Sequence, residues 1–267
     1  MTIRSTILGR MRLPHRPEVA ALAALAVILT ACGTEDAPGP LEPSCEQQGR
    51  VRFVNLITDP ARSPVNAILE GVPFGVNLGY TATTPASLPA PSTALYSAVC
   101  TGDRTIVLQH TPNPSVTHAT LNFTIGEGQD RTVYAIGGAG ATVITGFATT
   151  DDNAAPAAGQ TRVRIVNMSP TAGAIDVFLT TAGADLATAT PNATNLAYQA
   201  ASAYVNVAPG TYTFRAVPAG TAPASRAASV TITQAGIVLS GGTGRSVVTA
   251  DNNVGGTPLR AFVLSDR

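Results

Sequence analysis

The sequence has no tryptophan and no lysine, and aromatic residues make up only 5% of its 267 positions. So few aromatic rings leave little surface on which sugars can stack. Charged residues reach only 12%, and the formal net charge is zero. Four arginines and one acid lie before residue 32, which leaves 12 basic and 15 acidic residues in the rest of the chain. This excess of acids gives no electrostatic basis for binding nucleic acid.

The sequence also lacks the short motifs that mark common catalytic sites. It contains no G-x-S-x-G nucleophile turn and no HExxH zinc motif. The glycine-rich stretches at 137–140 and 241–244 lack the Lys-Ser/Thr pair of a phosphate-binding loop, so we expect turns with positive φ there. His110 and His118 stand in or beside a loop without an acid or nucleophile at a diagnostic spacing. Solvated loop histidines are therefore favoured over a general base, and we expect no catalytic residue, no metal and no cofactor.

The first 32 residues have the layout of an export signal. Arginines precede an apolar run at 19–29, and at 1.5 Å per residue a helix of that length spans only about half of the hydrocarbon core. The run ends in Leu29, Thr30, Ala31 and Cys32. These four residues resemble the lipobox of bacterial lipoproteins, in which the cysteine is acylated and becomes the first residue after cleavage.

The resemblance implies a signal peptide at 1–31, fatty acyl chains on Cys32 and a protein held in membrane lipid. Several acyl chains give stable anchoring, whereas one chain is marginal. Because Gly33 replaces the aspartate that marks inner-membrane retention in that family, the expected location is the outer membrane, on its periplasmic or surface side. The alternative is an ordinary signal peptide with an incidental cysteine. Residues 32–45, rich in proline, glycine and acids, are expected to form a flexible tether.

Two cysteines remain once Cys32 carries lipid. Cys45 and Cys100 would both face an oxidising compartment, which favours a disulfide between them. Free or metal-bound thiols are the alternative, although a metal site would need further ligands and only two histidines follow the signal.

The chain writes nearly the same six residues twice, RVRFVN at 50–55 and RVRIVN at 162–167. Further similar segments follow in the same order in both halves. The difference in residue number between matching segments changes by only a few residues at a time, as expected when loops differ in length between two copies. A period near 110 residues is too long for a solenoid and fits a duplicated domain. We therefore expect one domain at 46–150, a linker at 151–160 and a second domain at 161–267.

Each copy is expected to be all-β. Segments rich in β-branched and aromatic residues alternate with Gly, Pro, Asn and Asp at short intervals, and the chain has 25 glycines and 20 prolines. This pattern predicts two tandem antiparallel β-sandwiches with an immunoglobulin-like outline. In RVRFVN the alternation places Val51 and Phe53 on one face and Arg50 and Arg52 on the other. These two arginines, like Arg162 and Arg164, are expected to face solvent and to discourage strand aggregation.

Acidic residues offer two further candidate sites. Asp151 with its neighbours Asp152 and Asn153, and Asp251 with the two asparagines after it, could bind calcium, but neither stretch has a defined ligand order and turn formation is favoured. Asp176 could be a site residue. Because Asn66 occupies the matching place in the first copy, a hydrogen-bonding role is at least equally expected.

The segments RVRIVNMSPTAGAIDVFLTTAG and AYVNVAPGTYTFRAVPAGT resemble the bacterial family called domain of unknown function 4397. The second copy resembles it more closely than the first, in which LITDPARSP replaces the usual loop and Cys100 replaces the residue matching Ala208. The family implies exported, often lipid-anchored or repeated β-domains and no established activity. We therefore expect a non-enzymatic, lipid-anchored envelope protein that serves in adhesion, scaffolding or protein binding. The alternative is a module that binds a glycan or small ligand for an envelope transporter or enzyme. The partner would be an envelope or extracellular protein or a glycan.

Overall fold

The computed structural model describes residues 45–85 and 95–267, which belong to one compact unit. The predicted signal peptide, Leu29 to Cys32 and residues 32–44 of the predicted tether lie outside the described residues. Within those residues the chain is built from β-strands and three short 3-10 segments, which confirms the all-β prediction. No helical segment among them is long and apolar enough to cross a membrane. We call residues 45–151 the first half and residues 161–267 the second half.

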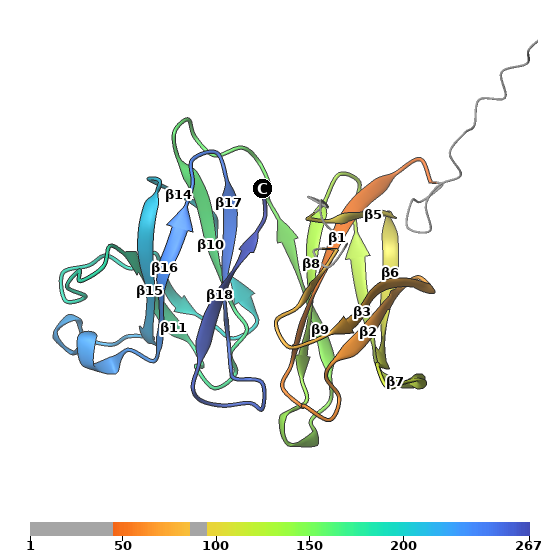
Figure 1. Ribbon diagram of the computed structural model, residues 1–267. Coiled ribbons are helices and arrows are strands. Elements are labelled where there is room, and N and C mark those ends of the chain that lie inside the picture. The colour runs from red at the N-terminus through yellow and green to blue at the C-terminus, as the bar shows by residue number, and fades with distance from the viewer. Residues whose placement is uncertain (1–44, 86–94) are drawn as a thin grey trace, which may run out of the picture. The chain divides into compact units, whose positions relative to one another are not determined.

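Two sheets make up the first half (Figure 1). The five-stranded sheet has the order β4-β1-β8-β9 with β5 also paired to β1, and contains β1 (Gln48–Ile57), β4 (Thr83–Thr84), β5 (Ser97–Cys100), β8 (Asp130–Gly137) and β9 (Thr145–Asp151). The four-stranded sheet has the order β3-β2-β6-β7, and contains β2 (Val65–Leu69), β3 (Val72–Leu78), β6 (Gly102–His110) and β7 (Asn113–Ile125).

The second half has the same strand order. Its five-stranded sheet runs β13-β10-β17-β18 with β14 paired to β10, and contains β10 (Thr161–Asn167), β13 (Ala200–Ala201), β14 (Val205–Val207), β17 (Gly244–Ala250) and β18 (Arg260–Ser265). Its four-stranded sheet runs β12-β11-β15-β16, and contains β11 (Ile175–Thr180), β12 (Ala193–Leu196), β15 (Gly210–Pro218) and β16 (Ile232–Leu239). The three 3-10 segments are Ala139–Ala141, Pro223–Ser225 and Ala227–Ser229.

One pairing in each half departs from the antiparallel prediction. β1 runs parallel to β8, and β10 runs parallel to β17, while the other pairs are antiparallel. Residue alternation reports which face a side chain occupies but not the direction of the neighbouring strand, so the sequence pattern did not distinguish the two arrangements. A parallel neighbour needs a long crossover, and here the four-stranded sheet lies between β1 and β8 in the chain.

Each half buries its own apolar core between its two sheets. In the first half, Val51 and Phe53 of β1 belong to one cluster with Ile106 and Leu108 of β6. In the second half, Val163 and Ile165 of β10 belong to the corresponding cluster with other residues of both sheets. This arrangement of facing sheets is that of a β-sandwich.

A third apolar cluster joins the two five-stranded sheets to each other. In β1 every residue from Val51 to Ile57 is buried, whereas a strand with one face in solvent would alternate between buried and exposed. The outer face of this sheet is covered by the outer face of the corresponding sheet in the second half. The cluster consists of Val54, Leu56, Tyr134, Ile136, Val166, Met168, Val248, Ala250 and Leu264.

Candidate functional site

The junction between the two halves buries charge as well as apolar surface. Arg52 and Arg164, expected in solvent, are only 3% and 2% exposed, so that prediction is wrong for both. The alternation itself is as expected, because each arginine points away from its own core. The face it occupies is covered by the other half, which a reading of one strand could not reveal. Arg50 fits the prediction better, with a side chain that is 57% exposed and pairs with Asp130.

Each buried arginine binds a carboxylate that belongs to the other half. Arg52 Nη2 donates to Asp266 Oδ1 at 2.8 Å, and its Nη1 donates to the carbonyl oxygen of Ser265 at 2.6 Å. In the reverse direction, Arg164 Nη2 donates to Asp151 Oδ1 and its Nη1 donates to the carbonyl oxygen of Thr150 at 2.9 Å. The two halves therefore exchange equivalent contacts, as the subunits of a two-fold symmetric dimer do.

Hydroxyl groups complete this buried network. Arg52 Nε donates to Thr132 Oγ1 at 3.1 Å, and Arg164 Nε donates to Ser246 Oγ at 2.7 Å. These contacts again correspond between the halves. Because every buried charge has an opposite charge and further hydrogen bonds, the network avoids the large desolvation cost of an isolated ion.

Two tyrosines cover the charges from the sides. Tyr96 donates its hydroxyl to Asp151 Oδ2 at 2.8 Å, and Tyr204 donates to Asp266 Oδ2 at 2.9 Å. Arg52 lies over the Tyr96 ring at 4.6 Å. Burial raises the pKa of both tyrosines, so their hydroxyls stay protonated and remain donors at neutral pH. All members of the network therefore have a structural role.

The acids weighed as calcium ligands are occupied in the same way. Asp151 accepts bonds from the network, and Asp152 pairs with Arg162, which lowers the pKa of Asp152 to about 2. Asp251 is buried and accepts the hydroxyl of Ser169 at 2.5 Å and that of Thr171 at 2.6 Å. Among the described residues no three His, Cys, Asp or Glu side chains are grouped so as to hold a metal.

Two pairs of Asx residues fix equivalent backbone positions. Asn66 Oδ1 accepts the amide of Asn77 at 2.9 Å, and Asp176 Oδ1 accepts the amide of Asn195 at 2.8 Å. The hydrogen-bonding role weighed for Asp176 is therefore present. The second pair was missed from the sequence. Asn55 and Asn167 are both buried. Asn55 donates to the carbonyl oxygen of Leu78, and Asn167 donates to that of Leu196. The repetition of this asparagine in both RVR-x-VN motifs could have indicated the shared role.

A hollow of about 330 Å³ opens at the junction further along β1. Its walls include Leu56, Ile136 and Met168 of the joining cluster. Tyr80 also lines it and donates its hydroxyl to the carbonyl oxygen of Asp251 at 2.5 Å. Val143, which is 77% exposed, stands at the same hollow. The space is mostly apolar, with a few polar groups, which is the usual character of a small-molecule site.

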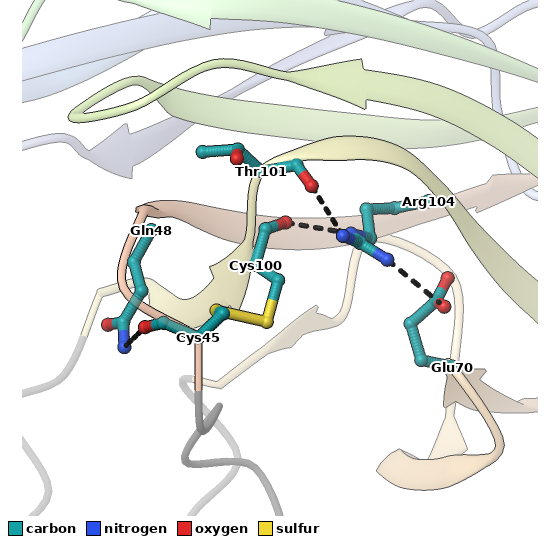
Figure 2. The surroundings of a disulfide bond; sticks show 6 residues. All are labelled: Cys45, Gln48, Glu70, Cys100, Thr101 and Arg104. Atoms are coloured by element: carbon teal, nitrogen blue, oxygen red, sulfur yellow. Dashed lines mark hydrogen bonds and ion pairs between the residues drawn. A yellow bond between two sulfur atoms is a disulfide. The ribbon is translucent and has the colours of Figure 1, made fainter.

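The predicted disulfide is present (Figure 2). Cys45 and Cys100 are bonded with their Cα atoms 5.8 Å apart, within the usual range for such bridges. Arg104 Nε donates to the carbonyl oxygen of Cys100 at 2.7 Å, and Arg104 also pairs with Glu70 at 3.6 Å. The bridge therefore ties the start of the described chain to β5, beside the beginning of β6.

The prediction that the two histidines stand in or beside a loop holds for His110, which precedes a turn, but is wrong for His118. His110 is the last residue of β6 and His118 lies in β7, and their rings are 5.1 Å apart. The glycine-rich stretch at 137–140 does form a turn with positive φ, as expected. At Gly137, with φ of 98°, a Cβ atom would lie 2.4 Å from the carbonyl oxygen of Val143.

Comparison with known proteins gives little beyond a family match. No curated protein matches the chain. One solved structure that is similar is a leucine-rich repeat protein from Bacteroides thetaiotaomicron VPI-5482, with 12% identity and a TM-score of 0.18, and the alignment covers 77% of this chain and 26% of that one. The sequence motifs resembled the family more closely in the second half. The family model instead matches mainly the first half, and its match extends into β10 and β11 of the second half. Residues 49–178 match the model of the family described as Domain of unknown function (DUF4397).

Proposed function

We propose that the chain is a non-enzymatic, lipid-anchored protein of the bacterial cell envelope, whose two joined β-sandwiches serve as a binding module. Adhesion, scaffolding and protein binding through the exposed loops are the roles that fit this body. The proposal rests mainly on the buried network. The network joins the two halves into one structural unit, and its arginines and aspartates are paired with each other, so they are not available as catalytic groups.

The export part of the proposal rests on two features that agree. The lipobox-like residues Leu29 to Cys32 follow an arginine-rich start and a short apolar run. The Cys45–Cys100 disulfide supports the same conclusion, because structural disulfides persist in oxidising compartments and are rare in the cytosol. Cys32 would hold the body in membrane lipid through its acyl chains.

The proposal includes descent from a duplicated domain. The two halves share their strand order, and Arg52 and Arg164 make equivalent contacts in opposite directions. A single ancestral domain that paired with a second copy of itself would leave this pattern after duplication and fusion. The DUF4397 match is consistent with this origin but assigns no activity.

The anchor is tested by fractionating cells that express Cys32→Ser. We expect this variant to be soluble or unprocessed, because the site of acylation is gone. Cys100→Ser is the matched control, since it removes a cysteine and the disulfide but leaves the acylation site intact, and it should stay in the membrane fraction. Full membrane attachment of Cys32→Ser would overturn the anchor. A tag after Arg267, exposed to protease on intact cells, then distinguishes the surface from the periplasm.

A small ligand is a second candidate, favoured by the hollow at the junction. Its apolar walls fit a compact apolar molecule with one hydrogen-bonding group. A ligand screen by thermal shift should find a compound that raises the melting temperature of the wild type. Val143→Trp should abolish the shift by filling the mouth of the hollow. Val116→Trp, at an exposed position on β7, should leave it unchanged. A flat response across the screen, or equal shifts in both variants, would reject this candidate.

A further inference from the structure

His110 and His118 form an isolated pair on the hairpin of β6 and β7. Their ring centroids are 5.1 Å apart and the rings are tilted by 43°. Neither ring makes a hydrogen bond to another residue in the part of the chain that the structure describes. The Nε2 atom of His118 is shielded from solvent and has no partner there. An imidazole nitrogen buried without a partner is costly, so a missing partner is a reasonable expectation.

The backbone directs His118 toward this arrangement. Leu108 pairs with Ala119, and Gln109 pairs with Thr117, so the pairing passes over His118. His118 is therefore the extra residue of a β-bulge, an irregularity that re-aims a side chain and is common beside functional sites. A regular hairpin would have kept the ladder continuous at this position.

The charge around the pair is nearly balanced. Asp59 and Arg62 are the charged groups that act on His118, and they pair with each other at 2.6 Å. Both carboxylate oxygens of Asp59 are occupied, one by Arg62 and the other by the amide of Ala61. Asp59 is therefore not free to serve as a third ligand. Burial, followed by the charges of His110 and Arg62, lowers the pKa of His118.

We propose that His110 and His118 together bind one divalent transition-metal ion, with Cu²⁺ preferred. Two neutral imidazoles on adjacent strands are suitable ligands for Cu²⁺, Ni²⁺ and Zn²⁺, and Cu²⁺ binds most tightly in this series. The remaining coordination positions are left to water or to a ligand from a partner. The site is independent of the junction and of the proposed binding module.

The test is a Cu²⁺ titration of the purified full chain, without a polyhistidine tag, followed by electron paramagnetic resonance. We expect one bound ion with a hyperfine pattern from two imidazole nitrogens. His110→Gln and His118→Gln should each weaken binding by roughly tenfold or more, because a ligand is lost. Gln109→Ala, which changes the neighbouring half-buried strand position, should bind as the wild type does.

The wild-type spectrum tests whether two imidazole nitrogens bind the ion, even where a variant folds poorly. A spectrum without imidazole nitrogens, or with one, would overturn the proposal. So would unchanged affinity in both ligand variants. As a second measurement, Zn²⁺ should shift the ring resonances of His110 and His118 together in nuclear magnetic resonance spectra, and separate or absent shifts would contradict the shared site.

Discussion

At the scale of single residues, three positions of the repeated RVR-x-VN motif have different structural roles. Val51 and its counterpart in β10 face the core of their own half. Arg52 and its counterpart cross to the other half. Asn55 bonds the carbonyl oxygen of Leu78 at the end of β3. Each task constrains one residue type, so little freedom remains at these positions. The motif is therefore repeated because both halves form the same three contacts.

The buried arginines should be far more sensitive to substitution than their neighbours. Arg164→Met would remove the nearer charged partner of Asp151 and leave it only the longer contact with Arg52 at 3.7 Å. Removal of one member of a buried pair costs about 3–5 kcal/mol. Arg162→Met is the control from the same strand. The Arg162 side chain is 15% exposed, but its partner Asp152 is 60% exposed and stays solvated when Arg162 is lost, so a loss of about 1 kcal/mol is expected. Chemical denaturation measures both values, and equal losses would contradict a structural role for the network.

Asp176 should respond as a backbone-bonding residue does. Its Oδ1 accepts the amide of Asn195 and its Oδ2 accepts the amide of Gly220. Asp176→Asn keeps one acceptor oxygen, so it should lose about 1 kcal/mol of unfolding free energy, whereas Asp176→Ala should lose more because both amides lose their partner. Denaturant midpoints give the order. An alanine variant as stable as the asparagine variant would contradict this role.

The pKa of His118 predicts a dependence of stability on pH. Because its folded pKa lies below its unfolded value of about 6.5, the folded state disfavours the proton. Stability is therefore complete above that value and decreases as pH falls from it toward the folded pKa. In metal-free buffer the wild type should lose more stability between neutral and mildly acidic pH than His118→Gln, which does not titrate. The effect should be small because the side chain is partly exposed, and parallel curves would exclude it.

At the scale of strands and sheets, the sequence predicted what local patterns encode. Strand composition and turn residues indicated the all-β fold. The pairing of Cys45 with Cys100 was predicted from the expected oxidising compartment and from the two cysteines that remain beside Cys32. The parallel pairing of β1 with β8 was not predictable, since alternation carries no information on strand direction. The burial of Arg52 was also hidden, because it depends on Ser265 and Asp266, which are 213 and 214 residues away in the chain. Local pattern assigned its face correctly, and only the three-dimensional fold identifies what covers that face.

The disulfide should stabilise the first half by restricting its unfolded chain. The bridge closes a separation of 55 residues, for which the chain-entropy model gives roughly 4 kcal/mol. Reduction should lower the denaturation midpoint of the wild type accordingly. The Cys100→Ser variant should unfold at the same midpoint with and without reductant. A wild-type midpoint that reductant leaves unchanged would show that the bridge adds no stability.

At the scale of the whole molecule, the two halves depend on each other. Without its partner, each five-stranded sheet would expose the residues of the joining cluster and a buried arginine together. Exposed apolar patches of that kind mark surfaces that associate. We therefore expect side chains on both sheets to hold the halves together without the covalent connection between β9 and β10.

This dependence can be tested by cutting the connection in the folded protein. A protease site placed between Ala155 and Ala158 lies in a mostly exposed stretch that joins β9 to β10, so its insertion should leave the fold intact. After cleavage the two fragments should elute together in size-exclusion chromatography at micromolar concentration. Cleavage of the Arg52→Met, Arg164→Met double variant should release them, because each removes a contact that crosses the junction. Wild-type fragments that separate on cleavage would mean that the linker, and not the buried network with its apolar cluster, keeps the two sandwiches together.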